Sequence, residues 1–100
     1  MHKDYDIIII GGGHNGLVAA AYLAKAGCKT LVLEQRAHLG GAVSRETLFE
    51  DFSVDIGSDD LGLIHPKVIQ DLDLERRGLT FIEPDVVAHA PSQVGEPLMF

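Results

Sequence analysis

The sequence predicts an α/β fold that begins with two parallel strands joined by a helix. Residues 7–10 are four consecutive isoleucines, and residues 30–33 form a second apolar run, Thr-Leu-Val-Leu. Continuous apolar runs of this kind are typical of parallel strands that need cover on both faces. Between them, apolar residues recur at the helical spacing i, i+3, i+4 and i+7, which predicts a helix from about Asn15 to Ala26 with Gly27 as its left-handed cap.

A glycine-rich turn, residues 11–16 with the sequence Gly-Gly-Gly-His-Asn-Gly, joins the first strand to this helix. In the G-x-G-x-x-G pattern, Gly11 permits a tight exit from the strand, Gly13 lets a pyrophosphate approach bare backbone, and Gly16 lets the helix pack close to the sheet. The helix N-terminus then offers unpaired N–H groups and a positive dipole end to an anion. The pattern therefore predicts a Rossmann-like βαβ unit that binds a dinucleotide.

Glu34 narrows the choice of dinucleotide. It ends the second strand, close to the expected position about 20 residues beyond the glycines. A carboxylate there can accept hydrogen bonds from a ribose diol, whereas a 2′-phosphate would meet like charge. The sequence thus favours FAD, or alternatively NAD, over NADP. Arg36 follows closely and is counted with the cofactor-binding residues in a flanking or adenine-side role, the alternative being a solvated loop charge.

The histidines differ in what their positions predict. His14 and Asn15 fill the positions between the second and third motif glycines and are placed in the cofactor site. A ring N–H of His14 could meet a phosphate, although a helix N-terminus disfavours the protonated ring. His38, His65 and His89 show no metal-ligand spacing, so no metal site is predicted. No catalytic acid or base can be named.

The rest of the chain is expected to form short strands and a small helix. The predicted strands span residues 42–46, 52–56 and 80–82, the predicted helix runs from Pro66 at its first position to about Leu72, and a hairpin joins residues 86–90 to 98–100. The later strands of a doubly wound domain are not recognisable. We therefore expect residues 1–100 to be the truncated N-terminal part of an FAD/NAD(P)-binding domain, with residues 80–100 starting a substrate-domain hairpin.

Charge argues against nucleic acid as a partner. The net charge is −7, and residues 46–100 carry twelve Asp and Glu against three Lys and Arg. Such an acidic segment repels a phosphate backbone. Exposed apolar strands instead predict self-association or pairing with a missing C-terminal portion.

Cysteine content and hydropathy indicate the cellular compartment of the protein. Cys28 is the only cysteine, so the chain can form neither an intrachain disulfide nor a CxxC redox pair. No apolar run approaches the ~20 residues of a membrane span, and the N-terminal run is too short for a secretory signal. These features predict a cytoplasmic protein without a transmembrane segment.

Several segments resemble one enzyme family. Residues 6–17, 33–34 and 40–41 resemble the N-terminus of FAD-dependent oxidoreductases of the phytoene-desaturase-like and amine-oxidase-like superfamily. Residues 52–58 resemble the segment that these proteins place near the flavin. Residues 65–79 resemble the next segment of phytoene-dehydrogenase-related members, so the resemblance covers nearly the whole chain.

The resemblance implies specific cofactor contacts. Three glycines would hold the FAD pyrophosphate, namely Gly11, Gly13 and Gly16. Glu34 would hold the adenosine ribose, and the backbone of Gly40 and Gly41 would approach the cofactor again. Ala42 stands where many members have arginine.

Together, these features suggest the FAD-binding segment of a flavin-dependent oxidoreductase whose parent removes a hydride from an apolar substrate of unknown identity. In such enzymes the cofactor carries the hydride chemistry and the protein orients it. The chain alone is expected to lack turnover. The alternatives are a stand-alone, non-catalytic NAD- or ADP-binding module and a truncated product without a function of its own.

Overall fold

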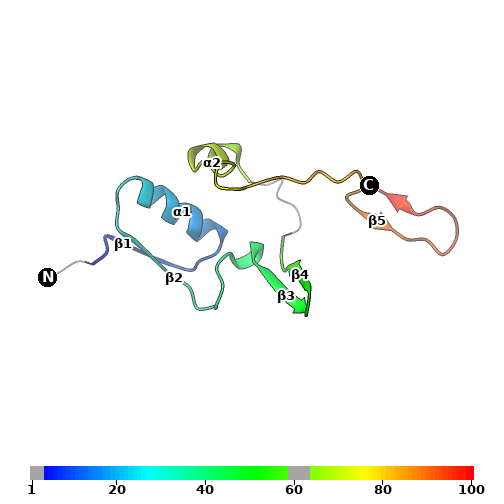
Figure 1. Ribbon diagram of the computed structural model, residues 1–100, viewed down its shortest axis with the longest axis horizontal. Coiled ribbons are helices and arrows are strands. Elements are labelled where there is room, and N and C mark those ends of the chain that lie inside the picture. Colours follow the sequence, from blue (N-terminus) through cyan, green and yellow to red (C-terminus); the bar gives the residue numbers. More distant parts are fainter. Residues whose placement is uncertain (1–3, 59–63) are drawn as a thin grey trace.

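Regular structure in the described part of the chain, residues 4–58 and 64–100, consists of three two-stranded sheets, two α-helices and one 3-10 turn. The computed structural model is elongated, with extents of 71 × 30 × 20 Å and a Cα radius of gyration of 18.5 Å. A compact domain of this length would have a radius of gyration of about 13 Å. The elements are strung out along the long axis, from the first sheet near the N-terminus to the hairpin at the C-terminus (Figure 1).

The first sheet and helix form the expected βαβ unit. Strand β1 (Ile7–Ile10) pairs in parallel with β2 (Thr30–Leu33) along its whole length. Helix α1 (His14–Lys25) connects the strands and lies one residue earlier than predicted. Gly27 follows with φ +91°, the left-handed conformation expected of a glycine after a helix end.

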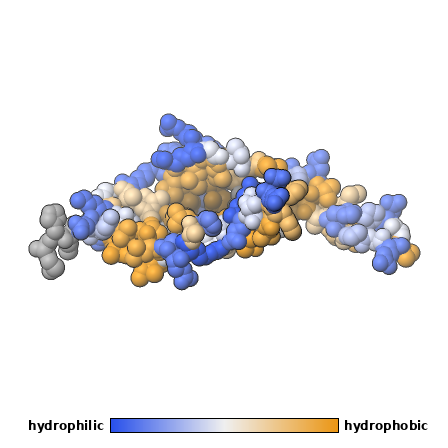
Figure 2. All heavy atoms as spheres, turned by 60° about the horizontal axis from the view of Figure 1, so that its bottom comes forward, coloured by the Kyte–Doolittle hydropathy of each residue, from blue (hydrophilic) through white to orange (hydrophobic). Residues whose placement is uncertain are grey.

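Among the described residues, helix α1 covers one face of this first sheet and nothing covers the other. A Cβ built on Gly16 of α1 would lie 3.4 Å from Cγ2 of Ile9, which places the Ile9 side chain on the helix-covered face. Ile8 and Ile10 point to the opposite face, where they are 56% and 88% exposed. Hydrophobic residues consequently gather on the surface of the molecule, as Figure 2 shows.

The second sheet is a hairpin that begins later than predicted. Strands β3 (Arg45–Phe49) and β4 (Phe52–Asp55) pair antiparallel. The strand expected over residues 42–46 is wrong in its first half, because residues 41–43 form the 3-10 turn η1 (Gly41–Val43). Gly40 and Gly41 have φ of +114° and +58°, so the chain turns there before it can extend.

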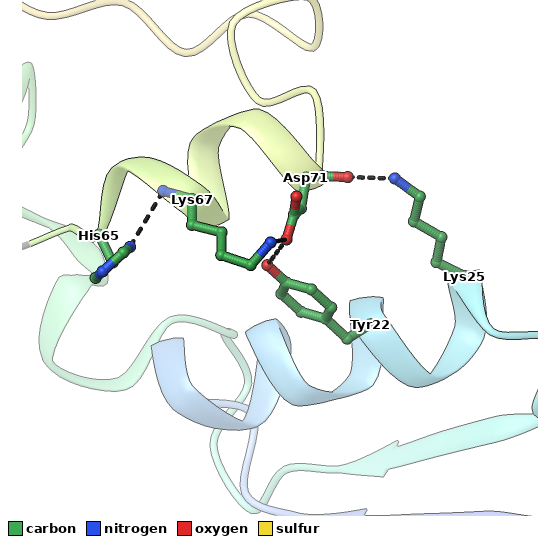
Figure 3. A network of polar contacts seen from close by, with 5 residues as sticks. All are labelled: Tyr22, Lys25, His65, Lys67 and Asp71. Carbon is green, nitrogen blue, oxygen red and sulfur yellow. Dashed lines mark hydrogen bonds and ion pairs between the residues drawn. The ribbon is translucent and has the colours of Figure 1, made fainter.

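Helix α2 (Pro66–Asp71) is found where it was predicted, with Pro66 at its first position. Nδ1 of His65 caps it by accepting a hydrogen bond from the Lys67 backbone N–H at 3.1 Å. Polar contacts fasten α2 to α1, as Figure 3 shows. The Tyr22 hydroxyl lies 2.7 Å from Oδ2 of Asp71, and Nζ of Lys67 lies 2.9 Å from the same oxygen. Nζ of Lys25 donates to the Asp71 carbonyl.

The predicted C-terminal hairpin is present, but the strand expected before it is not. Strands β5 (His89–Ala90) and β6 (Leu98–Met99) pair antiparallel, and the Phe100 N–H extends the ladder to the Ala88 carbonyl at 2.9 Å. Residues 80–82 are in no described strand, because no other described segment pairs with them, so that prediction is wrong.

Burial is concentrated at one place. Among residues 4–58 and 64–100, no hydrophobic side chain is buried, and the buried residues are Gly12, Gly40 and Ser44. All three belong to the contact between the turn after β1 and the turn before β3. The best-protected part of the molecule is therefore a backbone contact between two glycine turns. No helix in the described residues is long and apolar enough to cross a membrane.

Candidate dinucleotide site

The turn after β1 has the backbone geometry that its glycines require. Gly11 has φ +102°, and its N–H donates to the Leu33 carbonyl at 2.7 Å, which ties the turn to the end of β2. A Cβ on Gly16 would lie 2.2 Å from the Gly11 carbonyl oxygen, so any other residue at position 16 would force α1 away from the turn. The two glycines thus bring the helix N-terminus close to the carboxyl end of β1.

The N-terminus of α1 is open to an anion. Gly13 is the residue before the helix and carries no side-chain cap, and the first turn contains no acidic residue. Its backbone is extended with φ −72°, and the nearest atom to a Cβ built there is Cα of Gly41 at 3.9 Å. His14 and Asn15 are the first two helical residues, and both are exposed. Unpaired N–H groups at such a terminus favour phosphate.

The Gly40–Gly41 turn lies directly against this loop. The Gly40 N–H donates to the Gly12 carbonyl at 2.8 Å, and Gly40 forms an isolated parallel bridge with Gly13. A Cβ on Gly41 would lie only 3.0 Å from Cα of Gly13. Two glycine turns far apart in the sequence therefore form one backbone surface, and the close approach is possible because neither carries a side chain.

Glu34 lies beside the two glycine turns and is hydrogen-bonded to the first of them. Its Oε2 accepts the Gly12 N–H at 2.7 Å, and its Oε1 accepts the Arg36 N–H at 2.9 Å. The hydrogen bonds from the backbone of Arg36 and then of Gly12 lower the pKa of Glu34 below its ordinary value of 4.5. The carboxylate is therefore anionic at neutral pH. Each oxygen still has acceptor capacity, so a ribose hydroxyl can be added to these contacts.

Arg36 is engaged rather than free. Its guanidinium forms an ion pair with Oε1 of Glu46 in β3. One strand position away, Nε of Arg45 lies 3.2 Å from Oδ1 of Asp55. The two arginines border a hollow of about 390 Å³ beside the turn that follows β2, with lining residues Arg36, Ala37, His38, Arg45, Glu46 and Thr47.

Three residues of this region were missed by sequence reasoning. Gly12 donates to Glu34 and accepts from Gly40, yet as the variable position of the motif it was assigned no task. Glu46 pairs with Arg36, a contact that depends on where β3 lies and has no sequence pattern. Ser44 is 4% exposed, and its hydroxyl oxygen has no hydrogen-bond partner within residues 4–58 and 64–100. Its burial follows from the turn at Gly40, where a Cβ would lie 3.3 Å from Cβ of Ser44.

Metal ligands are not assembled in the described residues: among residues 4–58 and 64–100, no three His, Cys, Asp or Glu side chains lie together as a metal site would require. Cys28 is a half-exposed free thiol rather than the buried residue that is usual for cysteine. Sequence and structure thus concentrate the candidate functional residues at the two glycine turns and Glu34.

Comparison with known proteins places this site in a family. Residues 9–68 match the model for the "NAD(P)-binding Rossmann-like domain" family. The pyridine nucleotide-disulfide oxidoreductase domain-containing protein 2 of Mus musculus is 41% identical over 91% of this chain, which spans 16% of that protein. Its Rattus norvegicus counterpart is 45% identical over 79% of the chain and 14% of the relative.

A bacterial relative has a similar match. A limonene dehydrogenase subunit of Castellaniella defragrans is 41% identical over 86% of the chain, which again spans 16% of the relative. No solved structure matches this chain. The family match covers the end of β1, α1, β2 and both glycine turns, and it confirms the predicted α/β, Rossmann-like fold class. The chain belongs to the family of NAD(P)-binding Rossmann-like domains.

Proposed function

We propose that this chain is the adenine-dinucleotide-binding segment of an FAD-dependent oxidoreductase of the phytoene-desaturase-like type. The observation that carries the proposal is the position of the Glu34 carboxylate, held 2.7 Å from the Gly12 N–H at the start of the glycine turn. An anionic acceptor beside an open helix N-terminus suits a ligand with both a ribose diol and a pyrophosphate.

Each part of the site has a role in this proposal. The backbone of Gly11, Gly13 and Gly16 and the first N–H groups of α1 would hold the pyrophosphate. The Gly40–Gly41 turn would border the same phosphates, and His14 and Asn15 would flank them from the first turn of the helix. Glu34 would accept the adenosine ribose hydroxyls, with Arg36 beside it. A bound flavin would supply the hydride chemistry, and these residues bind and orient its adenosine half.

The oxidoreductase class is supported by the names of the relatives. The mouse and rat relatives are named for pyridine nucleotide-disulfide oxidoreductase domains, and the bacterial relative is named for a limonene dehydrogenase. Limonene is a hydrocarbon, which agrees with dehydrogenation of an apolar substrate. The single cysteine of this chain cannot form a dithiol pair by itself, so disulfide chemistry is not part of the proposal.

The uncovered face of the first sheet is proposed to bind further polypeptide. Ile8 and Ile10 leave a row of apolar side chains exposed beside the site. We infer that its occupant is the part of an α/β domain that the longer relatives have outside the matched region. Residues 80–100, which contain the hairpin of β5 and β6, would begin the substrate-binding side of that larger protein.

Titration of the chain with FAD, NAD and ADP-ribose by calorimetry tests the proposal. We expect all three ligands to bind through the shared adenosine and pyrophosphate, and a yellow, FAD-loaded protein on purification from cells. Binding of NAD without any binding of FAD would favour the non-catalytic nucleotide-binding module. Failure to bind ADP-ribose would contradict any dinucleotide function.

A further inference from the structure

The side chain of Arg36 is the first cation after Glu34, and β3 neutralises it. Its guanidinium is paired with the Glu46 carboxylate while its backbone N–H donates to Glu34. Both side chains remain partly exposed, at 42% for Arg36 and 34% for Glu46. The ion pair therefore lies at the surface of the hollow, where a ligand could reach it.

The hollow borders the turn that follows Glu34. If Glu34 accepts the ribose hydroxyls, we expect a group on the 2′ oxygen to lie on the side of this turn, because Oε1 of Glu34 also accepts the Arg36 N–H. That turn supplies Arg36, Ala37 and His38 to the lining of the hollow. Arginine binds phosphate well because its planar donors match phosphate oxygens. One nitrogen of the Arg36 guanidinium is already bonded to Glu46, so part of this donor set is in use and the Glu46 charge offsets that of the arginine.

We propose that Glu46 is a specificity-determining residue that excludes a 2′-phosphate from the site by keeping Arg36 paired. The inference rests on the proposed ribose contact of Glu34. A 2′-phosphate entering the hollow would meet the carboxylate of Glu46 and would have to displace it from the Arg36 guanidinium. Discrimination by a like charge that opposes the wrong ligand is a common device of specific sites.

A purely structural role for the Arg36–Glu46 pair is the competing explanation, because the pair also fastens β3 to the turn after β2. The neighbouring pair of Arg45 and Asp55 offers a matched control. This ion pair joins β3 to β4, so removing it also takes one ion pair from the same hairpin. Its arginine lines the same hollow but is not bonded to the ribose-binding carboxylate.

The test compares ADP-ribose with 2′-phospho-ADP-ribose, two ligands that differ only in the 2′-phosphate. Calorimetry would give the ratio of their affinities for the parent chain, Glu46→Gln and Asp55→Asn. Glutamine keeps the size of the side chain and can still accept a hydrogen bond, so the hairpin is expected to persist, which circular dichroism would verify. Glu46→Ala serves as a second variant, and Glu46→Gln with Arg36→Ala removes the freed guanidinium.

We expect Glu46→Gln to shift the affinity ratio toward 2′-phospho-ADP-ribose by about tenfold, roughly the effect of one charge-assisted hydrogen bond. Glu46→Ala should shift it in the same direction, and adding Arg36→Ala should abolish the shift. Asp55→Asn frees Arg45, which lines the same hollow but is not bonded to Glu34, and should shift the ratio less than Glu46→Gln does. An unchanged ratio in both Glu46 variants, or an equal shift in Asp55→Asn, would overturn the inference while leaving the proposed function intact. Failure of the parent chain to bind ADP-ribose would overturn both.

Discussion

The carboxylate of Glu34 accepts a hydrogen bond from the backbone N–H of Gly12 at 2.7 Å, which joins the end of β2 to the turn after β1. The acidic residue that would bind the ribose thereby also holds the loop that would bind the phosphates. A Cβ on Gly12 would lie 3.2 Å from Cβ of Glu34 and 2.5 Å from Cδ2 of Leu39, so a side chain there would displace Leu39 and press against Glu34. The two parts of the candidate site are coupled before any ligand arrives.

Replacing Gly13 with valine should abolish binding of ADP-ribose and leave the fold in place. The position has φ −72°, which valine tolerates, and a Cβ there has no neighbour closer than 3.9 Å. The added side chain would occupy the path of the pyrophosphate. Calorimetry with ADP-ribose measures the loss, and circular dichroism checks the fold. Equal affinity in variant and parent would remove Gly13 from the site.

Replacing Gly16 with alanine should instead damage the fold. A Cβ at position 16 would lie 2.2 Å from the Gly11 carbonyl oxygen, which is backbone and cannot move without shifting the turn. Gly13→Ala is the matched control, because the same atom fits there. We expect Gly16→Ala to lower the helical circular dichroism signal and the melting temperature well below those of Gly13→Ala. Similar melting of the two variants would contradict the close packing of α1 on the turn.

Binding of ADP-ribose should depend on the charge of Glu34. Hydrogen bonds from the backbone of Arg36 and Gly12 lower the pKa of this carboxyl below 4.5. The contribution of the charged carboxylate to binding is therefore complete above pH 4.5 and is lost only as the pH falls through the lowered pKa. Affinity should stay level from pH 7 to 5 and decline at lower pH. Glu34→Gln should bind more weakly throughout and lose this acidic step. An acidic step retained in Glu34→Gln would assign it to another group.

The contact between α1 and α2 should be visible in the titration of a tyrosine. The hydrogen bond with Asp71 raises the pKa of Tyr22 above 10.0, and the same bond is the main cause of the lowered pKa of Asp71. The contribution of neutral Tyr22 to the stability of the fold is therefore complete up to its ordinary pKa, and it is lost as the pH rises through the raised pKa. Absorbance of the phenolate should show Asp71→Asn lowering the pKa of Tyr22. Asp73→Asn, nearby in the chain, should have no such effect.

Substitutions on the open sheet face should reduce association with other polypeptides. Ile10 is 88% exposed beside the site, and Ile82 is 90% exposed in the segment between α2 and β5. If the sheet face is the docking surface, Ile10→Thr should decrease self-association more than Ile82→Thr. Size-exclusion chromatography with light scattering measures the difference. Equal effects of the two substitutions would indicate non-specific hydrophobic association rather than a defined docking surface.

The sequence was sufficient for the βαβ unit because several local patterns agree there. The isoleucine run, the helical spacing and Gly27 each mark a boundary, and β1, α1 and β2 lie within one residue of prediction. The strand expected over residues 80–82 failed for the opposite reason. Residues with a preference for strands do not form one unless another segment is present to pair with them.

Contacts made by side chains across the fold were beyond sequence reasoning. The Arg36–Glu46 pair depends on where η1 ends and β3 begins, and that was predicted too early because the positive φ values of Gly40 and Gly41 leave no periodic pattern. Glu34 was recognised from its spacing, yet its bond to Gly12 required the strand register. The burial of Ser44 follows from the same turn.

The location of the buried residues indicates which sequence positions tolerate substitution. In most proteins the least variable positions fill an apolar interior, where truncating a side chain leaves a cavity that costs stability. In the described residues here, burial is confined to Gly12, Gly40 and Ser44, at the contact of the two glycine turns. Selection for folding and selection for ligand recognition would then act on the same few positions. A mutational scan of this chain for ADP-ribose binding should find its intolerant sites at the glycine turns.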